Sequence, residues 1–266
     1  MFNPRRRSNQ LVSCLAVVGL LLFSCTADAE QTPTEAPKKP GADQVELPGI
    51  TIDSENKWID VDAKVALDEG MLEVIACTSD SREHESIVVV QAVPSHIHAA
   101  LLLIGANNGH PAMAKPANEE KTKWLHLPPR GDPIAISLVI PDPENQDKTI
   151  ERPISDFVKR TENEPAVEGD DAKQEEDAVK AFDTFVFAGS VVQQDNEGER
   201  HYLADINGNV VSISTFGDEV VCLPAKVSQD NAALMWSVDS THLPEVGAKV
   251  KLRLKLKEKP DEEADR

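Results

Sequence analysis

Aromatic residues are scarce in this sequence, and so are basic ones. Phe, Trp and Tyr together make up 4% of its 266 residues, so stacking surfaces for nucleotide bases or sugar rings are not expected. Lys and Arg number 27 against 46 Asp and Glu, which gives a formal net charge of −19 at pH 7. Nucleic acid attracts basic surfaces, so this composition argues against a nucleic-acid partner.

Cysteine is also rare, with four residues in the chain. Cys14 lies in an N-terminal apolar run and Cys25 just beyond it, which leaves Cys77 and Cys222 for the body of the protein. Two thiolates cannot hold an iron–sulfur cluster, which typically needs four, so a ferredoxin role is excluded. The sequence leaves open whether the two pair in an oxidising compartment. There is no Cys-x-x-Cys or His-Glu-x-x-His spacing and no phosphate-binding glycine loop.

The N-terminus has the pattern of an export signal. Three arginines, Arg5 to Arg7, precede an apolar run from Leu11 to Phe23 that is too short to span a membrane comfortably. The residues before Cys25 resemble a lipobox, so we predict that residues 1–24 form a signal peptide and that Cys25 is lipidated. Ala27-Asp-Ala29 is a competing site for ordinary signal cleavage. Both routes predict export, either to the periplasm with a lipid anchor in the outer membrane or as a secreted protein.

Composition divides the remaining chain into folded and unfolded segments. Pro, Ala and charged residues dominate residues 25–46, and acids dominate residues 161–181. Neither segment therefore has enough apolar residues to form a core. Apolar, β-branched runs recur on both sides of the acidic segment. The expected organisation is a disordered tether at 25–46, a first β-rich lobe at 47–160, an acidic disordered insertion at 161–181, a second β-rich lobe of the same module at 182–257 and a charged tail at 258–266.

Residue patterns predict a β-rich α+β fold, built from antiparallel sheets or a sandwich with one short buried helix near residues 94–104. Ile87 to Val93 is a continuous β-branched run, typical of a buried strand. Pro94 suits the first turn of a helix that ends before Gly105. Because nearly every residue of this helix is apolar, we expect it to be buried all round.

Two details of the second half give more specific predictions. Asn207-Gly208 between two β-like runs predicts a tight hairpin turn. The segment from Lys249 to Lys257 alternates strictly between basic and apolar residues, which gives one basic and one apolar face. We interpret this segment as an edge strand that its lysines protect from pairing with other chains.

One stretch gathers residue types that bind metals, namely Cys77, His84, Glu85, His96 and His98. His96 and His98 would diverge by about 200° on a helix, so a given cluster can include only one of them. The most economical site is Cys77, His84 and His98, with Glu85 as a further ligand, for zinc, copper or iron. Two other interpretations stay open. Each side chain can have a separate structural role, or Cys77 can act as a nucleophile beside a histidine.

Several motifs together resemble the YdjY-domain family of exported bacterial proteins. They are Leu72-Glu73 to Cys77, Arg82-Glu-His-Glu-Ser86, Ile97-His-Ala-Ala-Leu101 with Gly105, Phe185-Val-Phe-Ala-Gly-Ser190, Tyr202-x-Ala204-Asp205, Ser212-x-Ser214-x-Phe216 and Leu223-Pro224. The resemblance covers about Leu47 to Leu256, with the acidic segment as an insertion. It implies an exported location and a shared β-rich fold but no reaction, because the family is functionally uncharacterised.

The resemblance also bears on the candidate site. His96 is particular to this sequence, whereas the other candidates match the family's pattern: Cys77, His84, Glu85 and His98. The chain departs from the family at Phe185, where a Trp is usual, and at Cys222, where an acid is usual. The second departure makes a disulfide between Cys77 and Cys222 at most a local feature of this chain.

We therefore expect an exported, lipid-anchored envelope protein whose β-rich module binds another molecule or serves as a structural element. A mononuclear zinc, copper or iron ion is the candidate cofactor, and an unidentified envelope protein or small ligand is the expected partner. The alternative is a metal- or thiol-dependent envelope enzyme that uses Cys77, His84 and His98. An enzyme needs an open coordination position or an exposed thiol, whereas a structural cluster is closed and buried.

Overall fold

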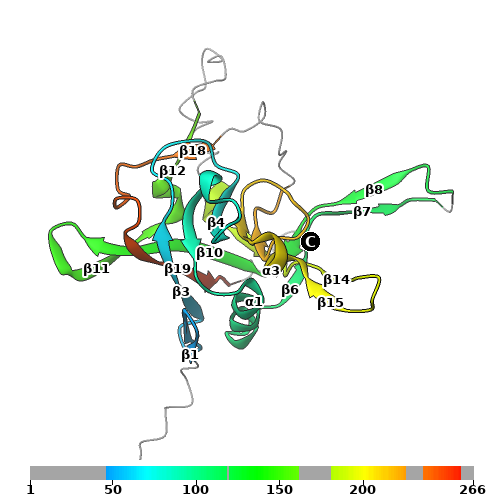
Figure 1. Cartoon of the computed structure of the whole chain (residues 1–266), viewed down its shortest axis with the longest axis horizontal. Coiled ribbons are helices and arrows are strands. Elements are labelled where there is room, and N and C mark those ends of the chain that lie inside the picture. The colour runs from blue at the N-terminus through cyan, green and yellow to red at the C-terminus, as the bar shows by residue number, and fades with distance from the viewer. Residues whose placement is uncertain (1–45, 119, 162–180, 226–235, 259–266) are drawn as a thin grey trace, which may run out of the picture. The chain divides into compact units, whose positions relative to one another are not determined.

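A computed structural model describes residues 46–118, 120–161, 181–225 and 236–258 (Figure 1). The predicted signal peptide, Cys25 and nearly all of the tether lie outside these residues. So do most of the acidic insertion and of the charged tail. The predictions for these segments therefore remain predictions.

Eight strands form a sheet that closes on itself. In order around the sheet they are β3 (Trp58–Val65), β19 (Lys249–Leu256), β10 (Pro133–Asp142), β13 (Phe185–Phe187), β17 (Val221–Cys222), β16 (Asn209–Ser212), β4 (Val74–Thr78) and β5 (Ser86–Val90). Pairing of β5 with β3 closes the ring. Two neighbouring pairs, β16 with β17 and β4 with β5, are parallel, and the other pairs are antiparallel. The predicted β-rich class is confirmed, and its main sheet is mixed and closed.

The two predicted β-rich ranges contribute alternately to this sheet. β19, from the end of the second range, lies between β3 and β10 of the first. The second-range strands β13, β17 and β16 lie between β10 and β4. Neither range can complete the ring without the other, so both form one sheet.

Further strands extend or flank the closed sheet. β1 (Glu46–Leu47) and β2 (Ile50–Asp53) continue it beside β3, and β11 (Asn145–Pro153) pairs with β10. Four small sheets have two strands each: β12 (Val158–Arg160) with β18 (Trp236–Val238), β14 (Val192–Gln194) with β15 (Arg200–Tyr202), β6 (Asn108–His110) with β9 (Arg130–Gly131), and β7 (Met113–Pro116) with β8 (Trp124–Leu127).

The described helices are short: α1 (Pro94–Leu103), α3 (Leu203–Asn207), and the single 3₁₀ turns η1 (Glu83–Glu85), η2 (Ile154–Phe157) and η3 (Ala181–Asp183). In this part of the chain, none is long and apolar enough to cross a membrane. Pro94 begins α1 as predicted. The expectation that this helix is buried all round is wrong, because Leu102 and Leu103 are 46% and 54% exposed.

Strict alternation along the strands builds the core. On β19, Val250, Leu252 and Leu254 are buried, whereas the basic residues between them face outward. They belong to one continuous hydrophobic cluster that also contains the buried rings of Phe185 and Phe187. Burial of apolar side chains of this size stabilises the fold by about 1.5–3 kcal/mol each.

Two local predictions are corrected by this arrangement. β19 is a central strand, paired on both sides, so its interpretation as an edge strand is wrong. Asn207-Gly208 ends α3 and does not form a hairpin turn. Gly208 adopts φ +76° and donates its N–H to the carbonyl of Ala204. A glycine with positive φ serves a helix C-terminus as well as it serves a hairpin turn.

Candidate functional site

Cys77 lies on β4, between β5 and β16, and is fully buried. Cys222 lies on β17, and β16 separates the two strands. Strands two apart in a sheet are about 9–10 Å from each other, which is beyond disulfide reach. Both thiols are accordingly free, and burial raises the pKa of Cys222.

His84 and Glu85 lie on η1 in a cluster of charged side chains. The imidazole of His84 is 75% exposed, with Nε2 3.6 Å from Oε1 of Glu85. Arg82 lies 3.2 Å from the buried carboxylate of Glu73 and 3.6 Å from that of Glu85, and its guanidinium stacks over the ring of Phe216. Burial, together with the neighbouring Glu85, raises the pKa of Glu73. Arg82 thus pairs with both the buried carboxyl group of Glu73 and the partly exposed one of Glu85.

His98 takes part in a different contact, with the β14–β15 hairpin. Its Nδ1 lies 2.9 Å from the hydroxyl of Tyr202, which in turn donates to the carbonyl of Gly189. With the hydroxyl donating to Gly189, His98 donates its Nδ1–H to Tyr202. The imidazole also packs edge-on against Phe187, and burial lowers the pKa of His98, which favours the neutral ring.

The same hydrogen-bond network continues into the loops around α3. Ser190, at φ +54°, donates its hydroxyl to the carbonyl of Asp218 and accepts the N–H of Ala204. The Asp218 carboxylate accepts hydrogen bonds from the side chains of Asn207 and Asn209. These bonds fix the loops that support the hairpin. The Ser190 hydroxyl is bonded to a backbone carbonyl, whereas an activated serine donates to a base.

A group of metal-binding residue types lies on the β14–β15 hairpin. Asp195, Glu199 and His201 each have a ligand atom within 4.8 Å of the others'. Nε2 of His201 is 2.9 Å from Oδ2 of Asp195, while Oδ1 of Asp195 accepts the N–H groups of Glu197 and Glu199. The hydrogen bond from His201, with those from the backbone, lowers the pKa of Asp195. This exposed Asp/Glu/His group can hold a metal ion.

The sequence-predicted ligands are placed elsewhere. In the part of the chain that the structure describes, Cys77, His84 and His98 belong to no group of three ligand atoms within 4.8 Å of one another. Cys77 is buried in the sheet, His84 is exposed on η1, and His98 bonds to Tyr202. Their joint role in metal binding stays a prediction.

A weak signal for the observed group was present in the sequence. Glu199 and His201 are two residues apart, so they project from the same side of an extended segment. Asp195 joins them only through the turn at residues 195–199, where its carboxylate accepts backbone N–H groups. The spacing matches no standard metal motif, so the group becomes visible only in the folded hairpin.

Comparison with family models identifies the fold's relatives. The model of the YdjY domain matches residues 50–255, which include every strand of the closed sheet except the last residue of β19. The chain belongs to the YdjY-domain family. The predicted resemblance is thereby confirmed, and the YdjY domain contains the hairpin group as well as Cys77, His84 and His98. No curated protein and no solved structure matches the chain.

Proposed function

We propose that this YdjY-domain protein is an exported, lipid-anchored binding module that holds a divalent metal ion at Asp195, Glu199 and His201. The observation that carries the proposal is the approach of three ligand atoms to within 4.8 Å of one another on one hairpin. The N-terminal arginines, the apolar run and Cys25 support export and anchoring.

The donor set suits a first-row divalent ion. One imidazole nitrogen and two carboxylate oxygens are ligands that zinc accepts, and three protein ligands leave a fourth position for water or a bound molecule. Bonds of about 2.0–2.2 Å place neighbouring ligand atoms of a tetrahedral site about 3.4 Å apart. The hydrogen-bonded pair of Asp195 and His201, at 2.9 Å, needs only a small opening to reach that separation.

The hairpin presents these ligands in a partly fixed arrangement. Oδ1 of Asp195 is committed to two backbone N–H groups, which orients Oδ2 toward His201. The next residue, Tyr202, bonds to His98 and so fastens the hairpin to α1. The side chains of Asp195 and His201 are 36% and 38% exposed, so an ion from solvent can reach them.

The enzymatic alternative is less favoured by the same geometry. A thiol nucleophile must be reachable and have a base within hydrogen-bond distance. Cys77 is completely buried within the sheet, and the imidazole of His98 bonds to Tyr202. A binding module accounts for these placements without an exposed thiol.

Titration calorimetry with zinc chloride tests the proposal on protein that has been stripped with a chelator. We expect a single site that His201→Ala abolishes. His126→Ala is the matched control, because His126 is an exposed histidine on another hairpin, and it should bind zinc as the unmodified protein does. His84→Ala tests the alternative metal site that the sequence predicts at Cys77, His84 and His98. Loss of zinc in His84→Ala with retention in His201→Ala would contradict the proposal, and so would no binding at all.

A further inference from the structure

The outer face of β3 and β19 carries a ladder of charged pairs. Arg253 lies opposite Asp60 and donates to both carboxylate oxygens, at 2.7 and 2.8 Å. One step along, Lys251 lies opposite Asp62, with Nζ 3.3 Å from Oδ1. In both positions a base on β19 meets an acid on β3. This is the arrangement that stabilises an antiparallel pair.

The next step of the ladder breaks this rule. Lys249 lies directly opposite Lys64, and both ammonium groups are exposed. Neither lysine makes an ion pair with another residue that the structure describes. Like charges directly opposite each other destabilise a strand pair. Acids outnumber bases in the chain, 46 to 27, so a pair of opposed lysines without an acidic partner runs against the overall composition. This unmatched lysine pair is therefore a candidate position for an external anion.

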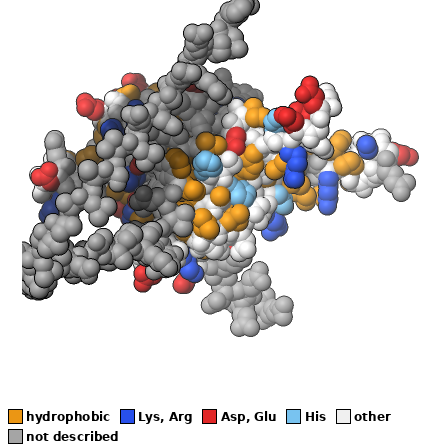
Figure 2. All heavy atoms as spheres, turned by 60° about the horizontal axis from the view of Figure 1, so that its bottom comes forward, with side chains coloured by type: hydrophobic (Ala, Val, Ile, Leu, Met, Phe, Trp, Pro, Cys, Tyr) orange, Lys and Arg blue, Asp and Glu red, His pale blue; other side chains and the backbone are white. Residues whose placement is uncertain are grey.

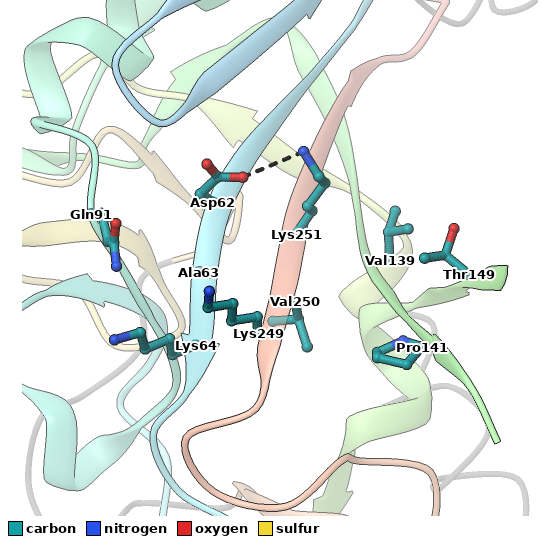
Figure 3. Close-up of a pocket in the computed structure, with 10 residues that line it drawn as sticks. All are labelled: Asp62, Ala63, Lys64, Gln91, Val139, Pro141, Thr149, Lys249, Val250 and Lys251. Carbon is teal, nitrogen blue, oxygen red and sulfur yellow. Dashed lines mark ion pairs between the residues drawn. The ribbon is translucent and has the colours of Figure 1, made fainter. Parts of the chain in front are cut away.

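A pocket of about 360 Å³ surrounds this lysine pair (Figure 3). Its volume falls within the range of about 300–1,000 Å³ that is typical of small-molecule sites. Figure 3 shows the Lys64 and Lys249 side chains directed to the same side of β19, toward the segment that carries Gln91. Val139 and Pro141 form an apolar wall on the other side of that strand.

The charges that line the pocket favour an anion. Lys64, Lys249 and Lys251 contribute three ammonium groups, and Asp62 contributes the one carboxylate among the lining residues, which Lys251 already pairs. Gln91 adds an amide that can donate to an oxygen. Two ammonium groups therefore remain for a ligand, beside a hydrogen-bond donor and an apolar surface.

We propose that this pocket binds a small dianionic phosphate monoester, with the phosphate between Lys64 and Lys249 and the organic group extending across β19 to Val139 and Pro141. Lysine binds phosphate as a compact point charge, and a phosphate monoester places nearly two negative charges on one compact group, which matches two neighbouring ammonium groups. The one arginine on this face of β19, Arg253, is already bound to Asp60 and Glu151. The site is separate from the metal-binding hairpin and is tested without metal.

Calorimetry at low ionic strength, with inorganic phosphate, glycerol 3-phosphate and succinate as probes, tests this site. We expect both phosphates to bind, with the ester tighter because it also uses the apolar wall. Lys64→Gln and Lys249→Gln should each weaken binding by about tenfold or more, because each removes a charged hydrogen bond. Lys255→Gln removes the same charge from the same strand outside the pocket and should leave binding nearly unchanged. Tighter binding of succinate, or equal weakening by Lys255→Gln, would overturn the proposal.

A charge reversal gives an independent measurement. Lys249→Glu completes the ladder with an acid opposite Lys64, so the variant should melt at a higher temperature than the unmodified protein when no anion is present. Added phosphate should raise the melting temperature of the unmodified protein but not that of Lys249→Glu. A phosphate-dependent rise of the same size in both proteins would show that the pocket is not the site.

Discussion

The hydroxyl of Tyr202 lies 2.9 Å from Nδ1 of His98, although 104 residues separate the two in the chain. This contact joins the β14–β15 hairpin to α1. The rings meet edge-on, with centroids 5.6 Å apart. Figure 2 shows histidines and apolar side chains side by side on the face where α1 lies. His98, for which the sequence predicts a role as a metal ligand, contacts the hairpin that carries Asp195 and His201.

Tyr202→Phe should lower the free energy of unfolding by about 1–3 kcal/mol, because it removes the hydroxyl that bonds to Nδ1 of His98 and to the carbonyl of Gly189. Urea unfolding of Tyr202→Phe, His98→Ala and the double variant gives the coupling between the two side chains. We expect the two losses to be clearly non-additive. Simple additivity would mean that the contact contributes nothing to stability.

Glu219→Gln should change the pH dependence of stability. Glu219 is fully buried, Oε1 accepts the N–H groups of Phe216 and Gly217, and Oε2 has no partner among the residues described. Burial raises its pKa above 4.5, so the folded protein keeps a proton that the unfolded chain loses. Stability from this group is therefore present below about pH 4.5 and is lost as the pH rises through the folded pKa.

Urea unfolding at several pH values between about 3 and 7 measures this effect. The stability of Glu219→Gln relative to the unmodified protein should rise with pH, by at most about 1.4 kcal/mol per pH unit. Glu151→Gln is the control, because it should change the pH dependence of stability in the opposite direction. Burial alone would raise the pKa of Glu151, but hydrogen bonds from Ser137 and Arg253 lower it, so this carboxylate stabilises the fold above its unfolded pKa. Parallel curves for all three proteins would contradict the account.

Gly208→Ala should destabilise the protein more than Gly247→Ala does. Both glycines have positive φ, +76° and +88°, so each alanine costs about 1–2 kcal/mol in backbone strain. A Cβ at Gly208 would also clash with the side chains of Thr78 and Ser81, whereas one at Gly247 meets nothing within 4 Å. Thermal unfolding of the two variants isolates the cost of the clash. Equal losses would show that the end of α3 moves away freely.

Cys25→Ser should move the protein from the membrane fraction to the soluble fraction. The prediction rests on the lipobox-like residues before Cys25. Mass spectrometry of the mature N-terminus measures the modification directly. An unmodified N-terminus at Glu30 would instead assign the ordinary cleavage site after Ala29 and leave the protein without this anchor.

Local patterns in the sequence predict individual strands and helices better than they predict which strands pair with one another. Alternation identifies β19, and Pro94 marks the start of α1, because both signals depend on residues close in the chain. The position of β19 between β3 and β10 depends on pairing over more than 100 residues, which periodicity does not encode. The prediction of a hairpin turn at Asn207-Gly208 is wrong because a helix end and a hairpin turn both need a residue with positive φ.

The same distinction applies to the sites. Cys77, His84 and His98 are close in sequence, but a buried strand, an exposed turn and a helix direct their side chains to separate places. Asp195 and His201 meet because a hairpin folds back within a few residues. The opposed lysines on β3 and β19 follow from strand register alone, since Lys64 and Lys249 lie far apart in the sequence.

X-ray absorption at the zinc edge, on protein loaded with one equivalent of zinc, tests the proposed metal centre most directly. A zinc ion held by Asp195, Glu199 and His201 should show oxygen and nitrogen neighbours at about 2.0–2.2 Å, with the outer scattering of one imidazole. His201→Ala should remove the imidazole signal. A sulfur ligand at about 2.3 Å would contradict the account, because it would place the metal at a cysteine and return the site to the residues around Cys77.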